Sequence, residues 1–379
     1  MERAAIVGVG QTRYERSKEG IVAELVYEAT CRALDDAGMK IGDIDSVVTV
    51  SNDFWDGRTI SCMAVADAAG CYGKDASTVE CDGAFGAFYG LMRVLSGYDT
   101  TLVVAHSKVS EGNPRIITNA AFDPIYERSL GLDAISASAL QARAYMKKFG
   151  VTEEQCALVS VKNHRNARNN PYAHVPLDIS VEDVMKSPKL ADPIKVLDAS
   201  PLSDGACAVI FAVESAAAKR AKKPVWVKGV SHCTDAYRLG ERDLTYSIAL
   251  ESAARRAYQM AGITDPWRQI DVAEVYDAFS YMELMWYEGL GFCDRGQGGR
   301  LIESGKTGMA GELPVNPSGG VLSAHSVLVA GLARIAEAVL QLRGEAGKRQ
   351  VAGARTALAQ GINGICAQQH CVWIVSTEQ

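Results

Sequence analysis

The chain has 379 residues and a formal net charge of −6, with 48% hydrophobic and 22% charged residues. This composition is usual for a globular protein. An acidic chain whose longest basic cluster is residues 219–223 is not expected to bind nucleic acid. No run of about 18 apolar residues occurs, so no membrane segment is expected. Residues 4–10 are typical of a buried strand and not of a signal peptide, so we expect a cytoplasmic protein.

The ten cysteines show neither Cys-x-x-Cys pairs nor histidine-rich spacing. Zinc sites and disulfide frameworks both need regular cysteine spacing, so neither a metal site nor a disulfide framework is predicted. The pattern fits a reducing compartment.

Two stretches of the chain predict the same helix–turn–strand unit. Residues 24–50 contain an amphipathic helix closed by Gly38, then an Ile-Asp pair and a β-branched strand. Residues 248–276 repeat this order, with Gly262 closing the helix. Glycine suits the left-handed conformation that often ends a helix. The shared order, at an offset of roughly 225 residues, indicates an internal duplication.

Further elements agree between the two halves. The first half predicts a strand at 77–81, a glycine-spaced turn, a helix through 91–95 and a strand at 101–105. The second half predicts a Gly-Gly turn at 319–320, His325 just inside a helix start, a helix at 332–340 and a strand at 371–375. Strands that alternate with helices favour an α/β protein with largely parallel sheets.

The predicted domains are an N-terminal half, residues 1–222, and a C-terminal half, residues 223–379. They join near Lys223-Pro224, where a polar helix should stop before a strand. Residues about 112–190 interrupt the duplicated pattern with polar helical segments, and we expect them to form an inserted loop lobe on the first half.

Five phrases occur in one order along the chain: residues 5–12, 163–174, 193–206, 276–280 and 319–325. Together they resemble the thiolase superfamily, in particular its sterol carrier protein-type and archaeal branch. The resemblance covers essentially the whole chain. It implies a thiolase fold with two duplicated βαβαβαββ halves in a five-layer αβαβα arrangement. In that fold the N-termini of two central helices meet at the active site.

The resemblance also implies site residues. Cleaving a β-ketoacyl thioester needs a thiolate, an oxyanion hole and an acid/base. His325, in Ala-His-Ser, lies where the family has the histidine of a Gly-His-Pro loop. Tyr276, in Tyr-Asp-Ala-Phe, lies where the family has an Asn or His, and its phenol is a candidate donor to an oxyanion. The structural alternatives are a structural histidine and a buried tyrosine at a strand end.

The nucleophile is less clearly marked. A cysteine at a helix N-terminus has a lowered pKa and suits this role. Counted from residues 79–80, the family's nucleophile position falls on Gly83, whereas counting back from Gly97 places Cys81 near the turn. Cys81 is therefore the candidate nucleophile, and its alternative is a structural thiol. Cys366 is the candidate second acid/base. His370 is expected to be a satisfied polar residue, and no residues are assigned to coenzyme A.

Three functions remain open. The first is an atypical acyl-CoA thiolase, an acyltransferase for a branched or aromatic ketoacyl-CoA, with coenzyme A as co-substrate and no permanently bound cofactor. The second is a retro-aldolase of the same fold that cleaves a β-hydroxyacyl-CoA without a cysteine nucleophile. The third is a non-catalytic scaffold subunit. The resemblance also implies a homodimer and a separate zinc-ribbon/OB-fold protein subunit as a partner.

Overall fold

The computed structural model describes residues 3–220 and 223–379. The predicted junction between the halves borders residues 221 and 222, which lie outside the described residues. Nine strands form one mixed sheet in the order β3-β2-β4-β7-β1-β8-β11-β10-β9. They are β1 (Ala4–Gln11), β2 (Ser46–Val50), β3 (Asp75–Val79), β4 (Thr100–Ser107), β7 (Gly205–Val213), β8 (Val225–Thr234), β9 (Val272–Glu274), β10 (Thr356–Asn363) and β11 (Gln369–Ser376).

The sheet repeats one topology in its two halves, and β1 and β8 join them. In the run β2-β4-β7-β1 the first pairing is parallel and the next two are antiparallel. The run β9-β10-β11-β8 shows the same three pairings. A parallel bridge between Ala273 and Val315 takes the place beside β9 that β3 has beside β2. The predicted duplicated α/β fold is confirmed.

The expectation of largely parallel sheets was wrong. Among the nine strands named above, the parallel pairings are those of β2 with its two neighbours and of β9 with β10. The loop between β10 and β11 covers only residues 364–368, which is too short for the crossover that parallel neighbours need. The last two strands of the second half are therefore antiparallel.

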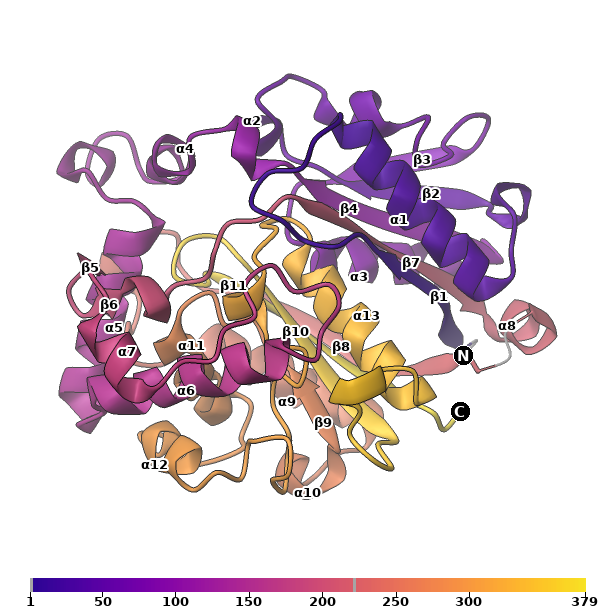
Figure 1. Ribbon diagram of the computed structural model, residues 1–379. Coiled ribbons are helices and arrows are strands. Elements are labelled where there is room, and N and C mark those ends of the chain that lie inside the picture. Colours follow the sequence, from indigo (N-terminus) through magenta and orange to yellow (C-terminus); the bar gives the residue numbers. More distant parts are fainter. Residues whose placement is uncertain (1–2, 221–222) are drawn as a thin grey trace.

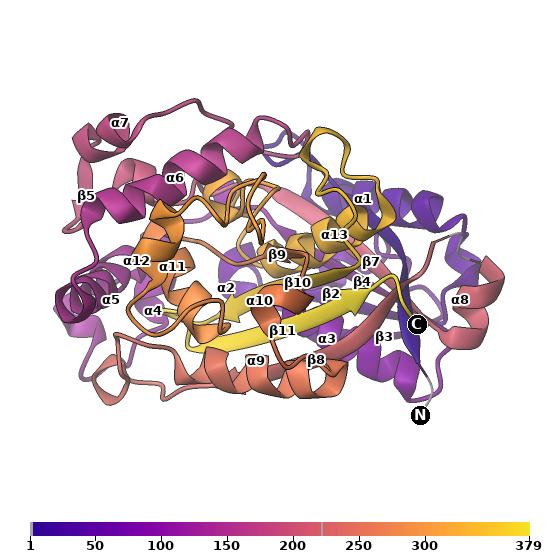
Figure 2. The same ribbon diagram turned by 90° about the horizontal axis from the view of Figure 1, so that it is seen from below.

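Outside the lobe, the helices of the two halves are α1 (Val22–Ala37), α2 (Asp53–Asp56), α3 (Gly83–Leu95), α8 (Glu214–Arg220), α9 (Ile248–Ala261), α10 (Pro266–Gln269), α11 (Ser280–Gly289), α12 (Gly298–Glu303) and α13 (Ala330–Arg343). α1 packs on β1 and β7, α9 packs on β8 and β11, and α3 and α13 pack on each other between the halves. Figure 1 shows α1 above, α13 in the middle and α9 below, and Figure 2 shows α9 along β8 and β11. These are the five predicted layers.

The first helix of each half lies very close to the first strand. A Cβ on Gly8 of β1 would strike the carbonyl oxygen of Ala33 in α1. A Cβ on Gly229 of β8 would strike the carbonyl oxygen of Ala257 in α9 in the same way. Glycine is needed at both positions because a backbone approaches there. The matching pairs repeat the duplication at the level of single contacts.

The predicted lobe is helical, as expected, and Figure 1 shows it at the left. It contains α4 (Pro114–Ala120), α5 (Ala134–Phe149), α6 (Glu153–Ala167), α7 (Val181–Lys186) and a hairpin of β5 (Lys189–Ala191) and β6 (Ile194–Lys195). Its helix α6 packs on α11 and α12 of the second half. The amides of Asn166 and Asn170 donate to the carbonyl oxygens of Asn316 and Ser318 at 3.0 and 2.9 Å. The lobe therefore supports the turn that leads to His325.

No helix in residues 3–220 and 223–379 is long and apolar enough to cross a membrane.

Candidate active site

The N-termini of the two central helices are bonded to each other. Gly83, the first residue of α3, donates its N–H to the carbonyl oxygen of Leu328 at 2.8 Å, just before α13. The N–H of Gly331 in α13 donates to Oδ2 of Asp82 at 2.8 Å. Segments 249 residues apart thus meet at one place, as the resemblance implied.

Tyr276 and His325 form a contact beside this junction. The phenol oxygen of Tyr276 lies 2.8 Å from Nε2 of His325, and the two rings are perpendicular with centroids 5.5 Å apart. Tyr276 follows β9 and is only 3% exposed, whereas His325 keeps partial exposure. His325 is therefore the more exposed member of the pair. Two of the four predicted site residues come together here.

His325 is fixed by the segment before β7. Ser200 Oγ lies 2.7 Å from Nδ1 of His325. The backbone of His325 donates to the carbonyl oxygen of Pro201 at 3.1 Å and accepts the N–H of Ser203 at 2.8 Å. The histidine thus sits in an extended segment. The prediction that it lies inside a helix start was wrong, because α13 begins only at Ala330.

The Tyr276–His325 pair is neutral near pH 7. Burial lowers the pKa of His325 to about 4 and raises the pKa of Tyr276 well above its ordinary value. A neutral phenol donates a hydrogen bond, and a neutral imidazole donates through one nitrogen and accepts through the other. Such a pair can stabilise an oxyanion and pass a proton.

The backbone of Tyr276 is held on both sides by buried side chains. Its N–H donates to Oε1 of Gln360 and its carbonyl oxygen accepts Nε1–H of Trp286, each at 2.7 Å. Nε2 of Gln360 lies 2.8 Å from Nδ1 of His370, whose Nε2 lies 2.9 Å from Ser247 Oγ. Burial lowers the pKa of His370 to about 3. His370 is thus a hydrogen-bonded polar residue that supports Tyr276 through Gln360.

Cys81 lies outside the helix. β3 ends at Val79, and Asp82 is the N-cap of α3. Cys81 therefore precedes the cap and is not part of the first turn of the helix. Its Sγ is 3.5 Å from Nδ2 of Asn363. Burial, and then the negative charges of Asp82 and Glu80, raise the pKa of Cys81 to about 11. The thiol is protonated at neutral pH.

Gly83 is the position to which the count from residues 79–80 assigns the family's nucleophile. It begins α3 and is buried. A Cβ there would lie 2.6 Å from Cβ of Leu332 and 3.1 Å from the carbonyl oxygen of Leu328. The packing of α13 against α3 leaves no room for a side chain at this position.

Cys366 lies in a different environment. It packs with Phe122, Ala137 and Leu239, whereas Tyr276 belongs to the main core of the second half. Its φ is 49°, a left-handed value. Burial raises the pKa of the Cys366 thiol to about 12. Cys366 therefore belongs to a different hydrophobic cluster from Tyr276 among the described residues.

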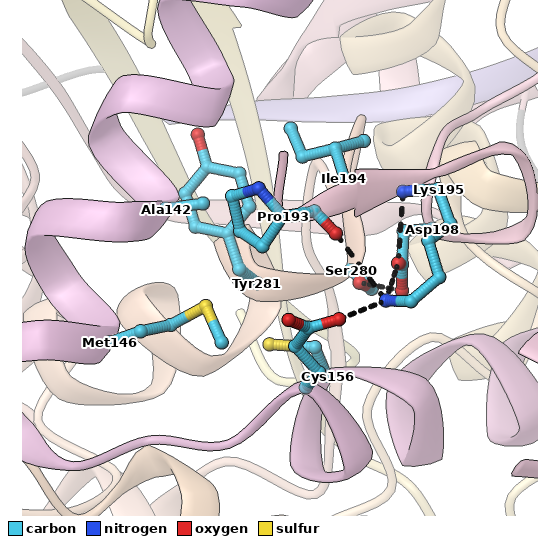
Figure 3. A pocket seen from close by; sticks show the side chains of 10 residues that line it. Ala142, Met146, Cys156, Pro193, Ile194, Lys195, Asp198, Ser280 and Tyr281 are labelled. Carbon is cyan, nitrogen blue, oxygen red and sulfur yellow. Dashed lines mark hydrogen bonds and ion pairs between the residues drawn. The ribbon is translucent and has the colours of Figure 1, made fainter. Parts of the chain in front are cut away.

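A separate small cavity lies between the lobe and the second half (Figure 3). Nζ of Lys195 pairs there with the carboxylates of Glu153 at 2.9 Å and Asp198 at 3.0 Å. The hydroxyl of Ser280 donates to Oδ1 of Asp198 at 2.8 Å. These groups satisfy one another and tie residues 198–200 to residues 276–280. These contacts thus stabilise the segments that carry Tyr276 and Ser200, and the cavity itself is not the candidate active site.

Sequence reasoning missed Asp82, Ser200 and Asn363 as neighbours of the candidate residues. Ser200 lies within the phrase 193–206, which carried part of the resemblance, and Asp82 lies in the glycine-spaced turn. No group of three or more His, Cys, Asp or Glu in residues 3–220 and 223–379 could hold a metal ion.

Comparison with known proteins identifies the family. The family described as thiolase C-terminal domain-like matches residues 231–377. An acetyl-CoA acetyltransferase of Methanothermobacter thermautotrophicus is 38% identical over 96% of this chain and 97% of its own. Sterol carrier protein 2 of Bos taurus is 32% identical over 95% of this chain and 70% of its own.

A solved structure extends the likeness to the fold. The "Ltp2-ChsH2(DUF35) aldolase" superposes with a TM-score of 0.86 at 24% identity, over 100% of this chain and 98% of the other. This structure supports the fold, and the two sequence relatives, each matched over at least 95% of this chain, show the family. The chain belongs to the thiolase superfamily, in the branch of the archaeal acetyl-CoA acetyltransferases and sterol carrier protein 2.

Proposed function

We propose that this protein makes or breaks a carbon–carbon bond next to a coenzyme A thioester, with Tyr276 and His325 as its oxyanion-binding and proton-transfer pair. The observation that carries this proposal is their 2.8 Å contact beside the joined helix N-termini. Coenzyme A is then part of the substrate, and no permanently bound cofactor is needed. A branched or aromatic acyl group is proposed because the motifs at 276 and 325 differ from the family pattern.

The first candidate reaction is thiolysis. The archaeal relative is named an acetyl-CoA acetyltransferase, which supports an acyl-CoA acyltransferase of the thiolase type. The Cys81 thiolate would attack the keto carbon of a β-ketoacyl-CoA. The Cα–Cβ bond would break, the released enolate would take a proton, and free coenzyme A would then accept the acyl group from sulfur. Cys366 as a second acid/base belongs to this candidate only.

The geometry favours the second candidate, a retro-aldol reaction. A base takes the proton of the β-hydroxyl group, the Cα–Cβ bond breaks and a carbonyl product leaves. The electron pair stays on the thioester enolate, which Tyr276 stabilises by donating a hydrogen bond until it is protonated. This reaction needs no thiolate. It fits both possible nucleophile positions, because one is Gly83, which has no side chain, and the other is Cys81, whose thiol has a pKa raised to about 11.

Replacement of Cys81 by alanine separates the two candidates. We expect Cys81→Ala to cleave a β-hydroxyacyl-CoA at close to the wild-type rate, because the aldol route forms no bond to sulfur. Thiolysis of a β-ketoacyl-CoA would instead fall by several orders of magnitude in the same variant, since no other nucleophile replaces the thiolate. Product analysis of both substrates is the measurement. The control is Cys62→Ala, which removes another partly exposed thiol.

We also propose a cytoplasmic homodimer with halves 1–222 and 223–379 and a second subunit. The name of the similar aldolase structure joins two components, Ltp2 and ChsH2(DUF35), which supports a partner chain. A zinc-ribbon/OB-fold protein is the partner that the family resemblance implies. It would help to enclose the long coenzyme A arm of the substrate.

A further inference from the structure

Asp82 caps two helices with one carboxylate. Its Oδ1 accepts the N–H of Ala84 in α3 at 3.0 Å, and its Oδ2 accepts the N–H of Gly331 in α13 at 2.8 Å. The residue is only 3% exposed. A carboxylate at a helix N-terminus satisfies unpaired N–H groups and offsets the positive end of the helix dipole. Here one side chain does this for both central helices.

The surrounding backbone is shaped around this carboxylate. A Cβ on Gly331 or on Gly361 would strike the Asp82 side chain. The N–H groups of the first turn of α3 all have acceptors: Gly83 donates to Leu328, Ala84 to the Asp82 side chain, and Phe85 and Gly86 to the Asp82 carbonyl oxygen. The helix end is therefore closed. It offers no open donor to a thiolate or to a substrate oxyanion.

The same contacts fix the segment that carries His325. Tyr276 binds this segment at His325 and, through its hydroxyl, at the carbonyl oxygen of Val327 at 3.3 Å. Asp82 binds it at Gly331. Residues 325–331 are thus held at both ends, by the phenol at one and by the carboxylate at the other.

Four charged or titratable groups lie near Asp82. They are Arg334 of α13, Tyr276 after β9, Cys371 of β11 and the adjacent Cys81. Burial raises the pKa of Asp82 to about 7, and the backbone N–H groups and Arg334 work in the opposite direction. A carboxyl group loses its proton as the pH rises through its pKa. Asp82 is therefore negative above about pH 7. Its charge then opposes ionisation of Cys81.

We propose that Asp82 is a positioning residue, an internal anion that closes both central helix ends, holds residues 325–331 against Tyr276 and keeps the neighbouring Cys81 from acting as a thiolate. This inference deepens the proposed function, because it gives the aldol candidate a physical cause. The inference about Asp82 rests on the proposed function only where it assigns a catalytic role to the Tyr276–His325 pair. The capping itself is tested without any substrate.

The test is alkylation of Cys81 by iodoacetamide in the full-length protein, followed by peptide mass analysis between about pH 7 and pH 10. In the wild-type protein we expect the rate to rise without a plateau across this range. In Asp82→Asn, which removes the charge at the shared cap, we expect Cys81 to react about tenfold faster at about pH 8, one unit of pKa. Cys62 in the same chain is the internal reference.

The matched control is Glu80→Gln. It removes the negative charge on the other side of Cys81, but Glu80 is exposed and caps no helix. Solvent screens an exposed charge, so we expect less than about a threefold change in the rate. Equal effects of the two variants would contradict the capping role of Asp82. If Asp82→Asn does not fold, the wild-type profile decides, because half-maximal alkylation below about pH 8.5 would overturn the inference. A wild-type protein that shows the expected alkylation pattern but acts on neither a β-hydroxyacyl-CoA nor a β-ketoacyl-CoA would instead refute the proposed function alone.

Discussion

The His325 ring is held at both nitrogens, by Ser200 at Nδ1 and by Tyr276 at Nε2. Either candidate reaction needs a group here that moves a proton. We expect His325→Ala to lower kcat by about 10²–10⁴, the usual span for a general acid or base. The control is His232→Ala, whose exposed ring packs on Phe88 in a T-shaped contact with centroids 4.8 Å apart. Steady-state kinetics of the two variants decide, and a loss below about tenfold in His325→Ala would assign that ring to structure.

Single residues were predictable where a phrase of the sequence marked them, and not where the fold alone brings them together. His325 and Tyr276 were found from their motifs, and the structure places them in contact. Ser200 lies 125 residues from His325 in the chain, and Asp82 lies 249 residues from Gly331. Nothing local in the sequence links such positions. Their roles depend on the packing of α3 against α13, which only the folded chain shows.

At the scale of elements, close packing depends on two equivalent glycines, and Gly229 of β8 offers the sharper test. A Cβ there would strike a backbone carbonyl oxygen of α9, which cannot turn away as a side chain can. Overpacking of this kind costs about 1–3 kcal/mol, so we expect Gly229→Ala to lower the free energy of unfolding by that amount. The control is Gly240→Ala, because a Cβ on Gly240 has no atom within 4 Å. Urea unfolding measures both, and equal stabilities would contradict close packing at Gly229.

The limits of helices were easier to predict than the directions of strands. Gly38 and Gly262 end α1 and α9 with φ of 63° and 71°, as the sequence indicated, because a left-handed helix end is a local requirement. Strand direction depends on which strands become neighbours, and the chain returns antiparallel at β7 and β11. The predicted strand at 77–81 also ends two residues early, since Asp82 must cap α3 and the chain leaves the sheet at Val79.

At the scale of the whole molecule, the site is shared between the proposed halves. The cap of α3 and Ser200 come from residues 1–222, whereas Tyr276, His325 and α13 come from residues 223–379. Each half alone would expose the face that α3 and α13 bury against each other. The geometry of the candidate site therefore depends on how the halves dock, and any second subunit that binds across them would act on the same geometry.

The proposed homodimer would pair through an edge strand of the first half. β3 is an end strand, bonded only to β2 within the sheet. The carbonyl oxygen of Val79 accepts the N–H of Ser51 on the β2 side. Because backbone groups alternate along a strand, the N–H of Thr78 points outward, where a second β3 would bind. Pairing of two β3 strands here would form an isologous dimer, and such dimers are the commonest form of closed symmetry.

We expect Thr78→Pro to shift the protein from dimer to monomer, because proline has no N–H to donate across the edge and is tolerated on an edge strand. Thr78→Ala is the control and should stay dimeric, since it keeps the backbone donor. Mass measurement of the untagged protein at several concentrations is the test, and it also shows whether a second chain and its zinc co-purify. A wild-type protein that is monomeric at all concentrations would refute the dimer. A dimer that survives in Thr78→Pro would place the interface elsewhere.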